Sequence, residues 1–184
     1  MSISTEIATL FAQRGNSQYG KEAVTQLEHA LQCAALAEAQ QAPPALVLAA
    51  LLHDIGHLLH ELPDDAPEQG IDDHHETSGY NYLRKHFSEA VSEPVRQHVA
   101  AKRYLCTTDP SYLEQLSEPS VVSLQLQGGT MSEEELETFR GSPHWEAAVA
   151  LRRWDDLAKV VDLETPDIDH YLGILANNEA SLCA

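Results

Sequence analysis

Basic side chains are scarce in this chain. Its 184 residues include 11 Lys and Arg against 29 Asp and Glu, so the formal net charge is −18 at pH 7. Such a field repels nucleic acids and anionic membranes, and we expect neither as a partner. The scarcity also makes the position of each cation informative.

Cysteines and long apolar runs are scarce as well. Cys33, Cys106 and Cys183 are scattered and odd in number, which is typical of reduced thiols. None has the close spacing of a thiolate site, so we expect any metal to take nitrogen and oxygen ligands. No segment approaches about 18 consecutive apolar residues, and the N-terminus lacks the pattern of a secretory signal. These absences predict a cytoplasmic protein.

Helical periodicity dominates the rest of the sequence, and alternating β-branched runs are few. The pattern predicts helices over about 24–40, from the prolines at 43 and 44 onward, and over about 75–87 and 92–103. Ser132 and Glu135 have the spacing of a capping box, and Ser142 and Thr165 are expected N-caps. With 43% hydrophobic residues and no linker or repeat, we predict one all-α domain over residues 1–184.

The stretch "LAALLHDIGHLL", residues 48–59, sets polar groups inside an apolar run. Its aliphatic residues fit one buried face of a single helix. Burying His53, Asp54 and His57 among them costs free energy unless these groups have partners. A bound metal ion is one such partner.

Further histidines and an aspartate complete a candidate ligand set. Four imidazoles and two carboxylates suit iron, manganese or zinc. A single ion needs only the His-Asp pair, one upstream histidine and one downstream aspartate, so the two extra histidines indicate a second ion. Asp54 is the natural bridge, and His75 is preferred to His74 because helical residues begin there. The set is His29, His53, Asp54, His75, His98 and Asp155; His60, His86, His144 and His170 are assigned no role.

Two cations accompany this set. Lys102 follows His98 by four residues and Arg152 precedes Asp155 by three, so each shares a helix face with a candidate ligand. They are placed to hold an anionic phosphate or phosphonate, whereas Arg103 and Arg153 fit a solvated surface. His57, one turn after His53, is expected to face the same cavity.

The segments "HALQCA", "LAALLHDIGH", "HVAAKRYL", "LQGGTM" and "RRWDDLAK" resemble the HD-domain di-iron oxygenases of organophosphonate catabolism, the PhnZ/TmpB type. More distantly they resemble myo-inositol oxygenase. "HDIGH" alone marks only the broad HD superfamily, but the other segments are more selective. The resemblance spans about residues 19–171. It implies an HD-domain helical bundle with a buried pair of iron ions in the mixed-valent Fe(II)/Fe(III) state, using O2 as cosubstrate.

The resemblance also assigns roles to individual residues. It implies the same six metal ligands with Asp54 bridging, and Asp54, His57 and Lys102 as catalytic residues. A tyrosine that caps an iron until substrate arrives matches Tyr19, and a glutamate that recognises the amine end of the substrate matches Glu22. The implied substrate-binding residues are Tyr19, Glu22, His57, Lys102, Ser120, Ser123 and Arg152; PhnZ carries threonine at the position of Ser123.

The implied reaction is oxidative cleavage of a C–P bond. The substrate would be a 2-(trimethyl)ammonio- or 2-amino-1-hydroxyethylphosphonate, giving glycine betaine or glycine plus phosphate. Acidic residues of the loop before His74, namely Asp64, Asp65, Asp72 and Asp73, favour slightly the trimethylammonio substrate. A 2-oxoglutarate/Fe(II) hydroxylase is the implied upstream partner.

Other functions remain open from the residues alone. An HD-domain phosphohydrolase would use a metal-bound hydroxide, and Lys102 and Arg152 would hold a phosphate ester equally well. A non-catalytic phosphonate or nucleotide sensor predicts a broken ligand set, whereas all six positions are intact. Myo-inositol oxygenase activity is less favoured because a neutral polyol needs no pair of cations.

Overall fold

The computed structural model describes residues 2–59 and 70–183, which are helical apart from turns and two isolated β-bridges. The predicted all-α fold is therefore confirmed. The helices are α1 (Ile3–Arg14), α2 (Gln26–Ala39), α3 (Pro44–Leu52), α4 (Ile55–Leu59), α5 (His75–Leu83), α6 (Glu89–Thr108), α7 (Pro110–Gln115), α8 (Glu118–Leu126), α9 (Glu133–Arg140), α10 (Trp145–Leu157), α11 (Ile168–Asn177) and α12 (Glu179–Leu182).

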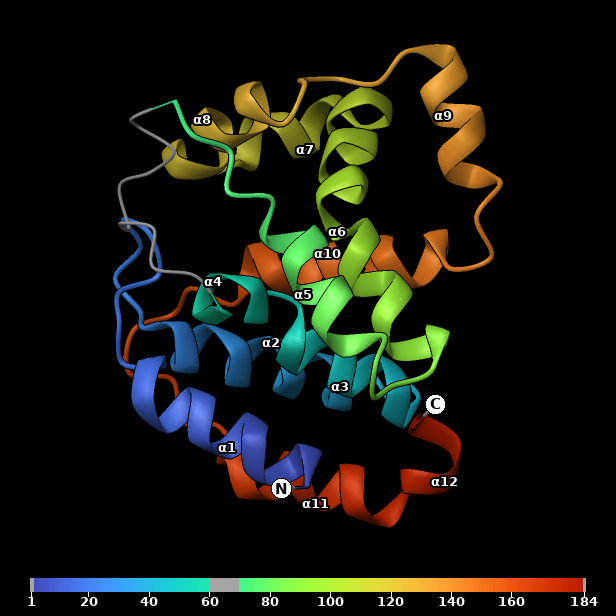
Figure 1. Ribbon diagram of the computed structural model, residues 1–184. Helices are drawn as coiled ribbons and strands as arrows, with labels where there is room; N and C mark the ends of the chain where they lie inside the picture. Colours follow the sequence, from blue (N-terminus) through green and yellow to red (C-terminus); the bar gives the residue numbers. More distant parts are fainter. Residues whose placement is uncertain (1, 60–69, 184) are drawn as a thin grey trace.

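Helices α2 and α3 form the middle layer of the molecule (Figure 1). They pack against each other, with α1 and α11 on one side and α5, α6 and α10 on the other. Aliphatic side chains such as Leu48, Leu51 and Leu151 are almost fully buried between these layers. These buried apolar faces fix the positions of the helices that carry the candidate ligands.

The predicted continuous helix over residues 48–59 is wrong, because α3 ends at Leu52 and α4 begins at Ile55. The Nδ1 of His53 donates to the carbonyl of Ala50 over 2.8 Å. That carbonyl is the acceptor that the N–H of Asp54 would use in an uninterrupted α-helix, so the side chain competes with the main chain. Leu59, expected in the buried face, is 38% exposed.

Gly56 allows α4 to approach the start of α5. A Cβ built on Gly56 would lie 2.0 Å from the main-chain oxygen of His75. We expect Gly56→Ala to push α5 away and to lower the melting temperature by about 5–10 °C, since overpacking costs about 1–3 kcal/mol. Circular dichroism melts would measure this. Gly173→Ala is the control because nothing lies within 4 Å of its added Cβ; equal melting of both variants would contradict the prediction.

Two predicted N-caps are wrong by a few residues. The chain makes a turn after Ser142, whose Oγ accepts from the N–H of His144, and α10 begins only at Trp145. The cap of α11 is Asp167 rather than Thr165, because its carboxylate accepts from the N–H of His170 over 3.0 Å. The capping box of Ser132 and Glu135 is confirmed.

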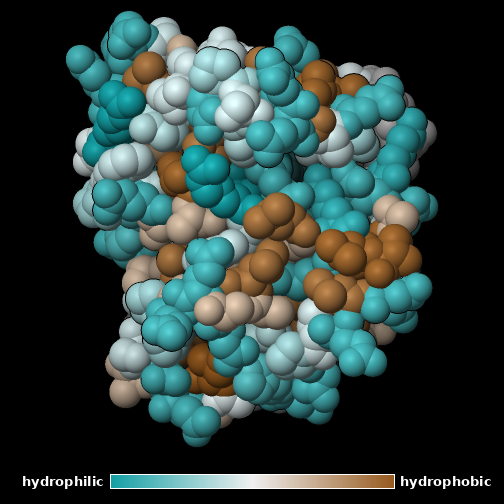
Figure 2. Space-filling view, turned by 180° about the vertical axis from the view of Figure 1, so that it is seen from behind, coloured by the Kyte–Doolittle hydropathy of each residue, from teal (hydrophilic) through white to brown (hydrophobic). Residues whose placement is uncertain are grey.

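The surface is mixed in polarity. Figure 2 shows the face opposite to that of Figure 1, where apolar patches interrupt a largely hydrophilic surface. Among residues 2–59 and 70–183, every helix falls short of the length and apolar character required to cross a bilayer.

Candidate metal centre

Four histidines meet in two facing pairs at the centre of the molecule. His29 of α2 and His53, directly after α3, have their Nε2 atoms 3.2 Å apart. His75, at the start of α5, and His98 of α6 have theirs 3.1 Å apart. All four histidines are at most 8% exposed. Segments far apart in the sequence thus place four imidazole nitrogens around one small volume.

The opposite nitrogen of each ring is held by an acceptor. The Nδ1 atoms of His29, His53 and His98 donate to the main-chain oxygens of Ala158, Ala50 and Val95 over 2.7–2.8 Å. The Nδ1 of His75 lies 2.9 Å from Oδ1 of Asp73. A neutral ring that donates from Nδ1 has its lone pair on Nε2. Each pair therefore directs two lone pairs at one point, the arrangement that suits a metal ion.

Asp54 lies between the two histidine pairs. Its Oδ2 is 3.2 Å from Nε2 of His53, and its Oδ1 is 3.4 Å from Nε2 of both His75 and His98. Both carboxylate oxygens are buried, and among the described residues neither has a hydrogen-bond partner. Buried oxygens of this kind need a compensating cation, so the residues present fit two metal ions with Asp54 shared between them.

Asp155 joins the His29 side of the cluster, where its Oδ1 is 3.3 Å from Nε2 of His29. Burial opposes its ionisation, but the charge of Arg152 and the contact with His29 hold the pKa of this carboxyl well below its usual range. Burial likewise opposes ionisation of Asp54, but its interactions with the neighbouring imidazoles, first that of His53, hold the pKa of this carboxyl well below the usual range. The centre therefore contains two carboxylates that attract cations.

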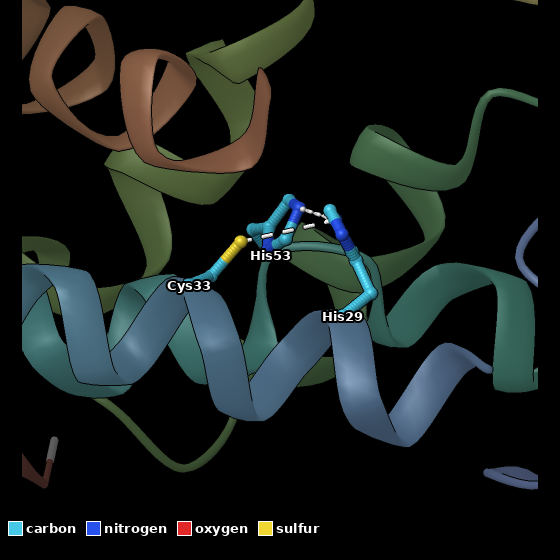
Figure 3. A group of neighbouring side chains, drawn as sticks. All are labelled: His29, Cys33 and His53. Atoms are coloured by element: carbon cyan, nitrogen blue, oxygen red, sulfur yellow. Dashed lines mark hydrogen bonds between the residues drawn. The ribbon is translucent and has the colours of Figure 1, made fainter. Parts of the chain in front are cut away.

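Cys33 was not expected near this centre. Figure 3 shows its thiol and the imidazoles of His29 and His53 pointing toward one another, with Sγ 3.8 Å from Nε2 of His29. These three side chains are close enough together to hold an ion. Burial, reinforced by the charges of Asp155 and Asp54, raises the pKa of the Cys33 thiol well above its usual value. A neutral thiol is a weak ligand, so nitrogen and oxygen ligands are favoured.

A pocket opens beside the centre, and the structure brings the predicted substrate-binding residues into its wall. Lys102 is 3% exposed, and its Nζ donates to Oγ of Ser123 over 2.8 Å. Burial, together with the charge of Arg152, lowers the pKa of Lys102 to about 7. The residues of the predicted set that line the pocket are Tyr19, Glu22, His57, Lys102, Ser120, Ser123 and Arg152.

Arg152 is held by three neighbouring side chains. Its Nη1 donates to Oδ2 of Asp155 over 2.6 Å, its Nη2 donates to Oδ1 of Asp156, and its Nε donates to Oη of Tyr112 over 3.1 Å. The guanidinium therefore orients a candidate ligand from behind while it faces the pocket. Two carboxylates offset its charge.

Tyr19 and His57 each stack on a candidate ligand. The ring of Tyr19 lies on that of His29, with centroids 3.8 Å apart, and its Oη donates to Oδ1 of Asp155 over 3.4 Å. His57 stacks on His75 at 4.1 Å. His74, by contrast, projects outward with 69% of its side chain exposed. The two stacked rings cover opposite ends of the cluster.

Arg103, Arg153 and the histidines to which the sequence assigned no role lie away from the pocket wall or outside the described residues. Arg103 pairs with Glu135 over 2.7 Å, and the guanidinium of Arg153 is 4.0 Å from Asp109. His86, His144 and His170 are absent from the pocket wall. His60, Asp64 and Asp65 fall outside the described residues.

A sequence model described as the HD domain matches residues 27–136, more than half of the chain and five of the six candidate ligands. The chain belongs to the HD-domain family. Two relatives support this membership over most of their length. A 1-hydroxy-2-(trimethylamino)ethylphosphonate dioxygenase (glycine-betaine-forming) of Leisingera caerulea is 42% identical over 165 residues, which cover 90% of this chain and 84% of that protein. A hydroxymethylphosphonate dioxygenase of Gimesia maris is 46% identical over 168 residues, 91% and 83% of the two chains.

Sequence reasoning missed roles for two residues of this HD-domain protein. Asp73 was noted only for its charge, yet it contacts both His57, over 2.7 Å, and His75. Lys159 lines the pocket and pairs with Glu22 over 3.0 Å. Lys159 follows Asp155 by four residues within "RRWDDLAK", the spacing of His98 and Lys102, but α10 ends at Leu157, so the two residues share no helix face.

Proposed function

We propose that this HD-domain protein is a mixed-valent di-iron oxygenase that cleaves the C–P bond of a 1-hydroxyphosphonate. The carbon that bears phosphorus is oxidised to a carboxylate while O2 is reduced, so that RCH(OH)PO3²⁻ and O2 give RCOO⁻, HPO4²⁻ and H⁺. The proposal rests on the position of the Asp54 carboxylate. It lies between two pairs of imidazoles whose Nε2 lone pairs face it, beside a pocket with buried cations. Both relatives described above are phosphonate dioxygenases by name, which favours this reaction over ester hydrolysis.

The six candidate ligands divide into two groups in this proposal. His29, His53 and Asp155 would hold one iron, His75 and His98 the other, and Asp54 both. When bound, the Fe(II)/Fe(III) pair supplies activation of O2 and acidification of the substrate hydroxyl. Asp73, which accepts from His75, fixes the orientation of that ring.

The pocket side chains would bind and orient the phosphonate. Lys102 and Arg152 provide cationic N–H donors, and the hydroxyls of Ser120 and Ser123 provide further hydrogen bonds. The Nζ of Lys102 already donates to Ser123, so lysine and hydroxyl act as one unit. With its lowered pKa, Lys102 is able to hold a proton beside the phosphonate oxygens and pass it to the departing phosphate.

Tyr19 and His57 would control access to the reacting carbon. The Tyr19 ring covers His29 and its hydroxyl reaches Asp155. We infer that substrate displaces this ring and that Tyr19 excludes water until then. His57, held by Asp73, presents its ring at the opposite wall.

The substituent on the reacting carbon is a finer question. The two relatives act, by name, on a trimethylamino-substituted phosphonate and on hydroxymethylphosphonate. The 2-(trimethyl)ammonio- and 2-amino-1-hydroxyethylphosphonates remain our proposed substrates, with a slight preference for the former, because Glu22 and Asp72 line the pocket. A hydroxylase dependent on 2-oxoglutarate and Fe(II) would supply the 1-hydroxy group.

The decisive test supplies the protein with iron, ascorbate and air. It then offers both nitrogen-bearing substrates and hydroxymethylphosphonate, while phosphate release and oxygen uptake are followed together. One O2 consumed per phosphate is the expected result. Phosphate release from a phosphate ester without oxygen uptake would establish a hydrolase instead.

The lowered pKa of Lys102 leads to a prediction about how kcat/KM depends on pH. Below its pKa of about 7 the ammonium is charged and binds the phosphonate; above it the free protein loses that charge. We therefore expect kcat/KM to fall as pH rises above 7, by up to about tenfold per unit. Lys102→Arg keeps its charge and is expected to lack this limb. The same limb in both proteins would mean that another group titrates.

A further inference from the structure

Lys159 sits in the pocket among four groups that recognise cations. Its Nζ lies 3.0 Å from Oε1 of Glu22 and donates to Oγ of Ser117 and of Ser120, each over 3.3 Å. It also lies 6.0 Å from the centroid of the Tyr19 ring. The side chains of Lys159 and Glu22 are only 15% and 18% exposed. The ammonium is therefore held on the wall of the pocket rather than in open solvent.

A cationic nitrogen in a substrate would need the same contacts that Lys159 makes. A quaternary ammonium is bound by carboxylate charge and aromatic faces, and a primary amine also donates hydrogen bonds. Glu22 and Tyr19 supply the charge and the face, but Lys159 already contacts both. Asp72 is 3.4 Å from Nδ1 of His74, and Asp73 is engaged by two other histidines.

We propose that Lys159 is a specificity-determining residue that competes with the cationic nitrogen of a substrate for Glu22. This inference rests on the proposed function and extends it to the choice of substituent. A cationic substrate has to displace Lys159 from Glu22 or bind beside a carboxylate whose charge Lys159 already neutralises. A substrate without nitrogen leaves the pair intact, so Lys159 reduces the preference for a cationic substituent that Glu22 alone would give.

A pair of substrates of equal shape isolates this effect. The first is 1-hydroxy-2-(trimethylammonio)ethylphosphonate, and the second is its carbon isostere, 1-hydroxy-3,3-dimethylbutylphosphonate. The ratio of their kcat/KM values is measured by phosphate release with the iron-loaded protein. Lys159→Met removes the positive charge. We expect it to raise the kcat/KM of the cationic substrate relative to that of the isostere by at least about tenfold, because Glu22 is then left without Lys159 and attracts the cation. Lys159→Arg, which keeps the charge, is expected to retain the wild-type ratio.

Each outcome has a definite reading. An unchanged ratio of kcat/KM values in Lys159→Met would overturn the proposal. If both substrates lose activity equally, Lys159 serves the phosphonate group that they share. A rise of this ratio in Lys159→Arg as large as that in Lys159→Met would also overturn the proposal. Lys159→Gln, which still donates to the serine hydroxyls, replaces the methionine variant if that one does not fold. Absence of phosphate from every substrate with wild-type protein refutes the proposed function itself, and this inference with it.

Discussion

Replacing His98 with alanine is expected to remove about one iron ion per chain and all phosphate release. His98 is 1% exposed, its Nε2 faces His75 and Asp54, and its Nδ1 is fixed by the carbonyl of Val95. Without it, only His75 and the shared Asp54 remain on that side, too few protein ligands for a stable site. Elemental analysis would count the iron, and Mössbauer spectra would show whether a mixed-valent pair forms.

His170→Ala is the matched control for this experiment. His170 lies on α11, is exposed, and pairs with Glu38 away from the pocket. It should keep two irons and wild-type turnover. Two irons and full activity in the His98→Ala protein would refute the dinuclear assignment. One iron with full activity would leave a mononuclear oxygenase.

Replacing Arg152 with alanine is expected to destabilise the protein as well as weaken substrate binding. The sequence suggested mainly the second effect. Arg152, however, donates to both Asp155 and Asp156 and is itself 5% exposed, so its loss leaves two carboxylates without their cation. Breaking a buried pair costs about 3–5 kcal/mol, which corresponds to a fall in melting temperature of about 10 °C or more.

Calorimetry and steady-state kinetics would separate the two consequences of losing Arg152. The control is Arg153→Ala, the neighbouring arginine, whose side chain is 52% exposed and stands 4.0 Å from Asp109. It should melt within about 2 °C of wild type, since exposed pairs contribute little. If Arg152→Ala melts like its neighbour, then Asp155 is held in place without the guanidinium.

The sequence predicts most helices because their signals are local. Apolar spacing marks α2, and the capping box at Ser132 marks the start of α9. The ligand set was predicted from residue chemistry and from the family resemblance, and the structure brings its six members together. The break after Leu52 was not predictable from periodicity, since it follows the hydrogen bond from the His53 ring to Ala50.

Contacts between distant segments were beyond the reach of sequence patterns. The pair of Glu22 and Lys159 joins residues 137 positions apart. The contact of Asp73 with His57 depends on how α4 meets α5 at Gly56. Neither pair shares a helix, so no helical spacing reveals it.

The anchors of the four imidazoles have a consequence for how this centre tolerates genetic change. His29, His53 and His98 are oriented by main-chain carbonyls, and a carbonyl survives any substitution of its own residue. His75 alone is oriented by a side chain, that of Asp73. Natural variation can therefore adjust the His75 half of the centre through a single codon while every ligand stays the same. The imidazoles of the His29 half offer no such route, and there only Asp155, held by the side chain of Arg152, is open to the same kind of adjustment.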